Sequence, residues 1–255
     1  MDTSKIASPL DTAPSSRRDF VKMAAAAGAG LVAAGALVPH KALAATDDPA
    51  TIIGVALTAE LLAVTFQTNA IANATTIGLT PAEVTTISAI LATEAYHIRY
   101  LEAFGAVPAY PGYVVNAATQ SVPFTFPTGT FSSRANYANV AILLETAFVA
   151  AYLAATRAFA ADARADLASL TFQIGAVEAE HRALSRAVGG YAPFSDVTFE
   201  LNLLPNVAAG AGFLISQGFI PATGAAPNTE THLYNDALTT DALTKYGGLV
   251  TQTTP

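Results

Sequence analysis

The chain has 255 residues, of which 52% are hydrophobic and only 12% charged, so it can bury one sizeable core. Its formal net charge is −7, and an acidic surface repels phosphate backbones, so we expect no nucleic-acid partner. The absence of cysteine excludes disulfides, iron–sulfur clusters, thiolate metal sites and cysteine nucleophiles. Any metal ion must therefore be bound by nitrogen and oxygen.

Residues 1–44 have the pattern of an export signal. Arg17 and Arg18 precede a Gly- and Ala-rich apolar run of sixteen residues (23–38), and a small-x-small cleavage sequence ends at Ala44. This pattern resembles a twin-arginine signal, which implies an exported protein, periplasmic or extracellular. The alternative is a membrane anchor, but the apolar run is shorter than the about 20 residues of a span. We expect cleavage near Ala44 and no stable membrane span afterwards.

Two helices are predicted in the first half of the mature chain. Asp48 followed by proline indicates the start of a helix that ends near residue 73. Thr80 and Glu83, on either side of a proline, form a capping box that opens a helix over 81–104. The first helix is apolar almost all round, which is typical of burial in a bundle or at a contact between subunits. The sequence is therefore compatible with a homo-oligomer.

Residues 105–132 are predicted to form a long crossover. They contain four prolines, three glycines and no charge, and Val122, Phe124 and Phe126 alternate as in a short strand. A bundle helix of about 25 residues is roughly 37 Å long, and 28 extended residues span more than twice that length. The segment can therefore return the chain from one end of a bundle to the other.

Two further helices are predicted after the crossover. One begins after Ser133 and continues to about Ala160, and Asp162 is expected to cap the next, which ends at Gly190. The order of hairpin, crossover and hairpin predicts an all-α four-helix bundle over residues 45–190. Prolines interrupt residues 191–255, which we expect to form an irregular, partly helical extension with one short helix near 207–217.

Two Glu-x-x-His motifs lie on predicted helices. Glu94 and His97 share one helix face, and Glu178 and His181 share another, because residues three apart lie on the same side of a helix. One such motif arises often by chance, but here two of the three mature histidines have it. Each helix can thus direct a carboxylate and an imidazole to one point.

Two other glutamates fall on apolar helix faces. Glu60 lies in the first helix and Glu145 in the third, and each precedes the Glu of the next Glu-x-x-His motif by 34 and 33 residues, respectively. Four carboxylates buried without partners would cost several kcal/mol each. Two divalent cations would neutralise them, and their natural ligands are these side chains. The sequence therefore predicts a site for two metal ions.

The order Glu, Glu-x-x-His, Glu, Glu-x-x-His over residues 49–190 resembles the di-iron and di-manganese carboxylate proteins of the ferritin-like superfamily. With its export signal and aromatic crossover, the chain is most similar to the desiccation-related ferritin-like domain family. The resemblance implies a ferritin-like bundle in which Glu94 and Glu178 bridge two iron or manganese ions, Glu60 and Glu145 are terminal ligands, and each histidine binds one ion.

Three functions are compatible with these features. The first is an oxidoreductase that acts on oxygen or peroxide outside the cytoplasm. The second is a non-enzymatic, metal-stabilised structural or desiccation-protective protein. The third, an iron-storage cage, is less favoured because the chain is poorly charged and has a long extension.

Five further residues are candidate neighbours of the metal ligands or candidate surface residues. Tyr152 and Tyr100 are spaced to reach the metals as hydrogen-bond donors, although filling the core is the commoner role of a buried aromatic residue. Gln67 can bond a ligand or face solvent, Glu180 is expected at the surface or in contact with a metal ligand, and His232 is expected to be exposed.

Overall fold

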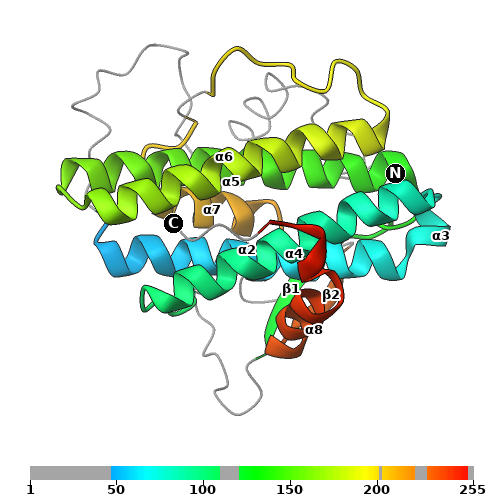
Figure 1. Ribbon diagram of the computed structural model, residues 1–255, viewed down its shortest axis with the longest axis horizontal. Coiled ribbons are helices and arrows are strands. Elements are labelled where there is room, and N and C mark those ends of the chain that lie inside the picture. The colour runs from blue at the N-terminus through cyan, green and yellow to red at the C-terminus, as the bar shows by residue number, and fades with distance from the viewer. Residues whose placement is uncertain (1–46, 110–120, 201–202, 222–228, 252–255) are drawn as a thin grey trace, which may run out of the picture.

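Four long helices form the centre of the protein (Figure 1). The computed structural model describes residues 47–109, 121–200, 203–221 and 229–251. The long helices are α2 (Pro49–Ala72), α4 (Pro81–Ala103), α5 (Arg134–Ala161) and α6 (Ala165–Gly189), and the single turn α3 (Ala74–Ile77) joins the first two. The predicted all-α four-helix bundle is confirmed. The export signal predicted for residues 1–44 lies outside the described residues.

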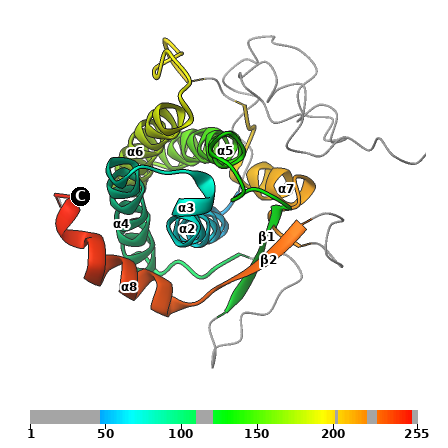
Figure 2. The same cartoon turned by 90° about the vertical axis from the view of Figure 1, so that its right-hand side faces the viewer.

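The bundle consists of two helical hairpins. Viewed end-on, α2 lies beside α4 and α5 beside α6 (Figure 2). The chain passes from the first hairpin to the second through the long connection after α4, which contains the strand β1 (Val122–Pro127). The predicted crossover and its short strand are therefore both present.

Most of the predicted helix ends are confirmed by hydrogen bonds. The Asp48 carboxylate accepts from the backbone N–H of Thr51 at 3.0 Å, and the capping box at the start of α4 is complete. Asp162 does not cap α6. Its backbone N–H bonds back to the carbonyl of Ala158, and the chain reverses only at the next residue, where φ is +58°. Asp162 therefore ends α5, and α6 begins without a side-chain cap.

Helix α2 lies at the centre of the core. Every residue from Ile52 to Gln67 is buried, as expected for a helix that is apolar all round. Helices α2 and α5 are long and apolar enough to cross a membrane. However, 78% of the most apolar 18-residue stretch of α2 and 83% of that of α5 are buried inside the protein. Such burial is typical of core helices in a bundle.

An aromatic cluster attaches the crossover to the bundle. The ring of Phe66 on α2 lies 5.5 Å from Phe126 on β1, 5.5 Å from Phe131, and 5.3 Å from Tyr137 on α5, measured between ring centroids. Aromatic pairs at these separations stabilise a core beyond the area they bury. The part of the crossover that includes Phe126 and Phe131 therefore belongs to the core.

The segment after α6 has more regular structure than the sequence indicated. Besides the expected short helix α7 (Val207–Ser216), it forms β2 (Thr229–Tyr234), α8 (Asp236–Tyr246) and the 3₁₀ turn η3 (Gly247–Leu249). Strand β2 pairs antiparallel with β1, so that Val122 lies opposite Tyr234. Helix α8 packs on α4, and α7 packs on α2 and α5. The extension thus wraps around the first hairpin.

The expectation that His232 is exposed is wrong. Its ring lies 5.4 Å from Phe126 and 5.7 Å from Phe131, and only 22% of the side chain is exposed. Pairing of β2 with β1 places His232 against the aromatic cluster. Its partial burial there lowers the pKa of the imidazole.

Candidate metal centre

The bundle brings all six predicted ligands together in its interior. Each of the four long helices contributes, and none of the six residues is more than 5% exposed. They are Glu60 on α2, Glu94 and His97 on α4, Glu145 on α5, and Glu178 and His181 on α6. The positions agree with the sequence prediction. Metal binding by these residues stays a prediction.

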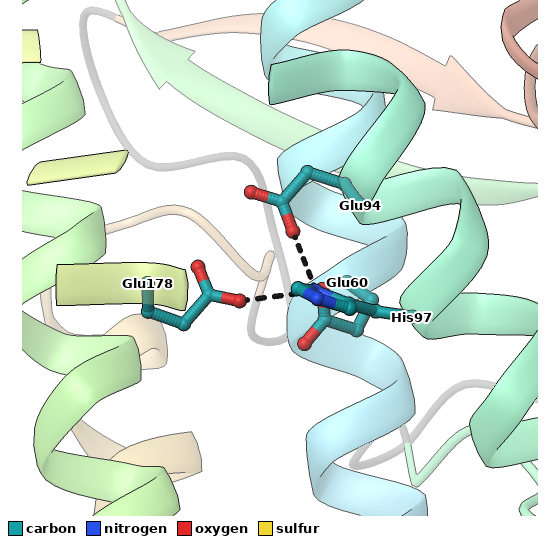
Figure 3. A group of neighbouring side chains, drawn as sticks. All are labelled: Glu60, Glu94, His97 and Glu178. Carbon is teal, nitrogen blue, oxygen red and sulfur yellow. Dashed lines mark hydrogen bonds and ion pairs between the residues drawn. The ribbon is translucent and has the colours of Figure 1, made fainter. Parts of the chain in front are cut away.

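Glu94 and Glu178 lie between the two histidines. Nδ1 of His97 is 3.2 Å from Oε2 of Glu94 and 3.1 Å from Oε1 of Glu178 (Figure 3). Nδ1 of His181 is 2.8 Å from Oε1 of Glu94 and 3.4 Å from Oε2 of Glu178. Each carboxylate thus presents one oxygen to each imidazole, as a bridging ligand must.

The six residues form two overlapping groups of candidate ligands. One contains Glu60 and His97, the other contains Glu145 and His181, and both contain Glu94 and Glu178. Within each group, one donor atom per residue lies within 4.8 Å of the others. The imidazole rings are 6.3 Å apart between centroids. This arrangement has the approximate two-fold symmetry that the 34- and 33-residue spacings imply.

The two outer carboxyl groups favour their protonated forms. Burial raises the pKa of Glu60 well above its usual value, and the Glu178 carboxylate raises it further. Burial also raises the pKa of Glu145, with further contributions from Glu178 and Glu94. A proton on each of these groups reduces the repulsion within the cluster.

The histidines favour their charged forms despite burial. Burial disfavours the imidazolium, but Glu60, Glu178 and Glu94 together raise the pKa of His97 well above its usual value. The pKa of His181 rises to about 10, because Glu94 and Glu178 outweigh the same effect of burial. Burial alone would raise the pKa of Glu94, but both histidines hold it well below its usual range. Protons therefore supply the positive charge that this acidic cluster needs.

The donor atoms fit a divalent metal ion. Among the described residues, five buried atoms of the cluster make no hydrogen bond of ordinary geometry: both oxygens of Glu178, one oxygen each of Glu94 and Glu145, and Nδ1 of His181. Four of these atoms take part instead in the imidazole–carboxylate contacts at 2.8–3.4 Å described above. Carboxylate oxygens and imidazole nitrogens directed into one space are ligands for iron and manganese, and a bound ion would satisfy them.

Two buried tyrosines donate hydrogen bonds to side chains of α2. The hydroxyl of Tyr152 on α5 donates to Oε1 of Glu60, and burial raises the pKa of this phenol well above its usual value. The hydroxyl of Tyr137 donates to Oε1 of Gln67 at 2.9 Å. Gln67 is buried and does not face solvent, and its side-chain oxygen accepts this hydrogen bond. Tyr152 holds one oxygen of Glu60 and leaves the other directed towards His97 at 3.4 Å.

The remaining residues near the motifs are placed outside the cluster. Glu180 is exposed, as expected, and Tyr100 is partly buried and packs against the hydrophobic core. The sequence did not indicate two buried arginines on α6. Arg182 pairs with Glu200, and Arg186 pairs with Asp196 at 3.1 Å. They attach the segment after α6 to the bundle and do not neutralise the cluster.

Residues 48–191 match the family model of a ferritin-like domain, and this range is more than half of the chain and contains all six candidate ligands. The chain belongs to the ferritin-like domain family. No curated protein and no solved structure matches it. The matched range ends just after α6, so α7, β2 and α8 lie outside it.

Proposed function

We propose that this ferritin-like domain is an exported protein that binds two iron or manganese ions and reacts with oxygen or hydrogen peroxide. The observation that supports this proposal best is the placement of Glu94 and Glu178, whose four oxygens are divided between the two histidines at 2.8–3.4 Å. Two carboxylates that face two imidazoles in this way suit a pair of ions that share their bridging ligands.

The side chains of the domain would bind, orient and shield this pair. Glu60 and Glu145 would each add one carboxylate to one ion, so that four carboxylates balance the charge of two divalent ions. The hydrogen bond from Tyr152 fixes the orientation of Glu60. Burial of the six side chains, none more than 5% exposed, limits the access of bulk water. When bound, a pair of iron or manganese ions supplies a two-electron redox change that suits oxygen and peroxide.

A metal-stabilised structural protein, including a desiccation-protective one, is the second candidate. The observation in its favour is the burial of all six ligands at the centre of the core, where bound ions would stabilise the fold whether or not they react. The two functions predict the same metal content. They differ in whether the loaded protein turns over an oxidant.

Metal analysis followed by mixing with oxidant tests the proposal. Protein loaded anaerobically with Fe(II) or Mn(II) should hold two ions per chain, and the double change Glu94→Ala, Glu178→Ala should remove both. Glu180→Ala is the matched control, because this exposed residue lies one position before His181 and should leave the metal content unchanged.

Stopped-flow absorption with oxygen, and oxygen release from hydrogen peroxide, then report the reaction. His97→Ala and His181→Ala should abolish either signal and leave the helical content largely intact. Full metal loading with no reaction in either assay would support the structural function and contradict the redox proposal. Less than about half an equivalent of metal would contradict both.

A further inference from the structure

A pocket reaches the candidate metal centre from one side of the bundle. It has a volume of about 160 Å³ and lies between α4 and α6, which are neighbours at the left of the bundle in Figure 2. His97 on α4 forms part of its wall, and Val250 and Thr251, which follow η3, line it from the C-terminal tail. The tail packs closely there, since a Cβ at Gly247 would lie 3.0 Å from the hydroxyl oxygen of Tyr96.

His97 belongs both to this wall and to the candidate metal centre. The contacts of its ring with Glu60, Glu94 and Glu178 all involve Nδ1, at 3.1–3.4 Å. The opposite edge of the imidazole takes part in none of these three contacts. A molecule in the pocket would be separated from the carboxylate cluster by one imidazole ring.

The lining of the pocket suits a neutral molecule. Among the described residues that line it, none is Asp, Glu, Lys or Arg. The one cationic group in the wall, the imidazole of His97, is already paired with Glu94 and Glu178, so a charged ligand would lose its hydration there without gaining an unpaired opposite charge, which is unfavourable. Leu170, Ile174 and Val177 provide apolar walls, and Tyr96 and Gln173 provide a hydroxyl and an amide. Small-molecule sites typically combine apolar walls with a few polar groups in this way.

The size of the pocket suits one ring. A cavity of about 150 Å³ is large enough to hold benzene. The apolar crevice on another side of the bundle, where Tyr152 lies against α7, has only about 20 Å³, which is enough for one water molecule but not for an organic ligand. The α4–α6 pocket is therefore an opening at the cluster that can take a ring-sized molecule.

We propose that the α4–α6 pocket binds a neutral, single-ring molecule that carries a hydroxyl group, of the phenol class. The ring would pack against Ile174 and Val177, and the hydroxyl group would bond to Tyr96 or Gln173. Binding requires only the pocket. The placement of this ligand beside a metal ion rests on the proposed function.

Titration of the purified protein with 4-fluorophenol, followed by ¹⁹F NMR, tests the binding. Saturable binding is expected, and Val177→Phe should weaken it by about tenfold or more, because the added ring fills the pocket. Ala176→Phe is the matched control, since the neighbouring residue is exposed and should leave binding unchanged. Val250→Trp fills the pocket from the tail without changing α6, and should weaken binding as well. The anion 4-fluorobenzoate should bind at least about tenfold more weakly than the phenol.

Absence of saturable binding would overturn the inference, as would equal losses in Val177→Phe and Ala176→Phe or equal affinity for the benzoate. Protein loaded with Mn(II) should relax the bound probe much faster than protein loaded with diamagnetic Zn(II). A bound probe that shows no such enhancement in protein that holds Mn(II) would place the ligand elsewhere and overturn the inference. Protein that binds the probe but takes up no Mn(II) would instead overturn the proposed metal function and support the pocket.

Discussion

Loading the cluster with two metal ions should release several protons, since carboxylates and imidazoles bind metals in their deprotonated forms. The pKa of His181 is raised to about 10, so this imidazole carries a proton at pH 7, and the pKa of His97 is also raised by its carboxylate neighbours, which favours its protonated form. The raised pKa values of Glu60 and Glu145 favour a proton on each of these groups as well. We therefore expect two to four protons to be released per pair of ions at pH 7.

Side chains with ordinary pKa values would behave differently. A histidine with a pKa of about 6.5 is only about one quarter protonated at pH 7, so two of them would release about 0.5 proton, and ordinary glutamates would release almost none. With two to four protons released, lowering the pH from 7 to 6 should weaken the joint affinity for two ions by about 100- to 10,000-fold.

Isothermal titration of the metal-free protein with Mn(II), in buffers of different ionisation enthalpy, measures the protons released. His181→Gln should lower the number by at least about one, because this imidazolium is lost. His232→Gln should leave it unchanged, because His232 lies against the aromatic cluster and not at the metal centre. Release of less than about one proton by the unchanged protein would refute the electrostatic description of the cluster.

Two further predictions come from the structure and one from the sequence. Metal-free protein should melt at a lower temperature at pH 9 than at pH 7. The raised pKa of His181 stabilises the folded state fully below the unfolded pKa of about 6.5, and this stabilisation is lost as the pH rises through about 10. An equal melting temperature at the two pH values, measured by circular dichroism, would contradict this prediction. Tyr152→Phe removes the hydrogen bond to Glu60 and should lower the free energy of unfolding in urea by about 1–3 kcal/mol, whereas an unchanged midpoint would show that the bond contributes nothing. Changing Arg17 and Arg18 to lysine should trap the precursor inside the cell, and undiminished export on immunoblots of cell fractions would show that residues 1–44 are not a twin-arginine signal.

The helices and the candidate ligands could be predicted because they depend on local rules. The capping box at Thr80 and Glu83 involves residues three apart, and the pairing of Glu94 with His97 follows from the period of one helix. The burial of Glu60 could be predicted because the residues around it on α2 are apolar. Such information is contained in a few consecutive turns of sequence.

The structure of the C-terminal extension could not be predicted, because it depends on distant contacts. Strand β2 includes Glu230 and His232 and has no regular apolar alternation, so only its pairing with β1 identifies it. The bond from Tyr152 to Glu60 depends likewise on the way α5 faces α2 across the bundle. Sequence spacing placed this tyrosine near the site but could not select its partner.

The pairing of β1 with β2 affects the order in which the chain can fold during synthesis. Val122 pairs with Tyr234, more than a hundred residues later, so the two hairpins can form on the ribosome before the crossover strand has its partner. Until then, β1 has an open edge and apolar side chains such as Phe124 and Phe126, which favour aggregation. A chain that terminates before β2 would keep every candidate ligand but leave this strand unpaired. Synthesis of β2 therefore protects the nascent protein from self-association through β1.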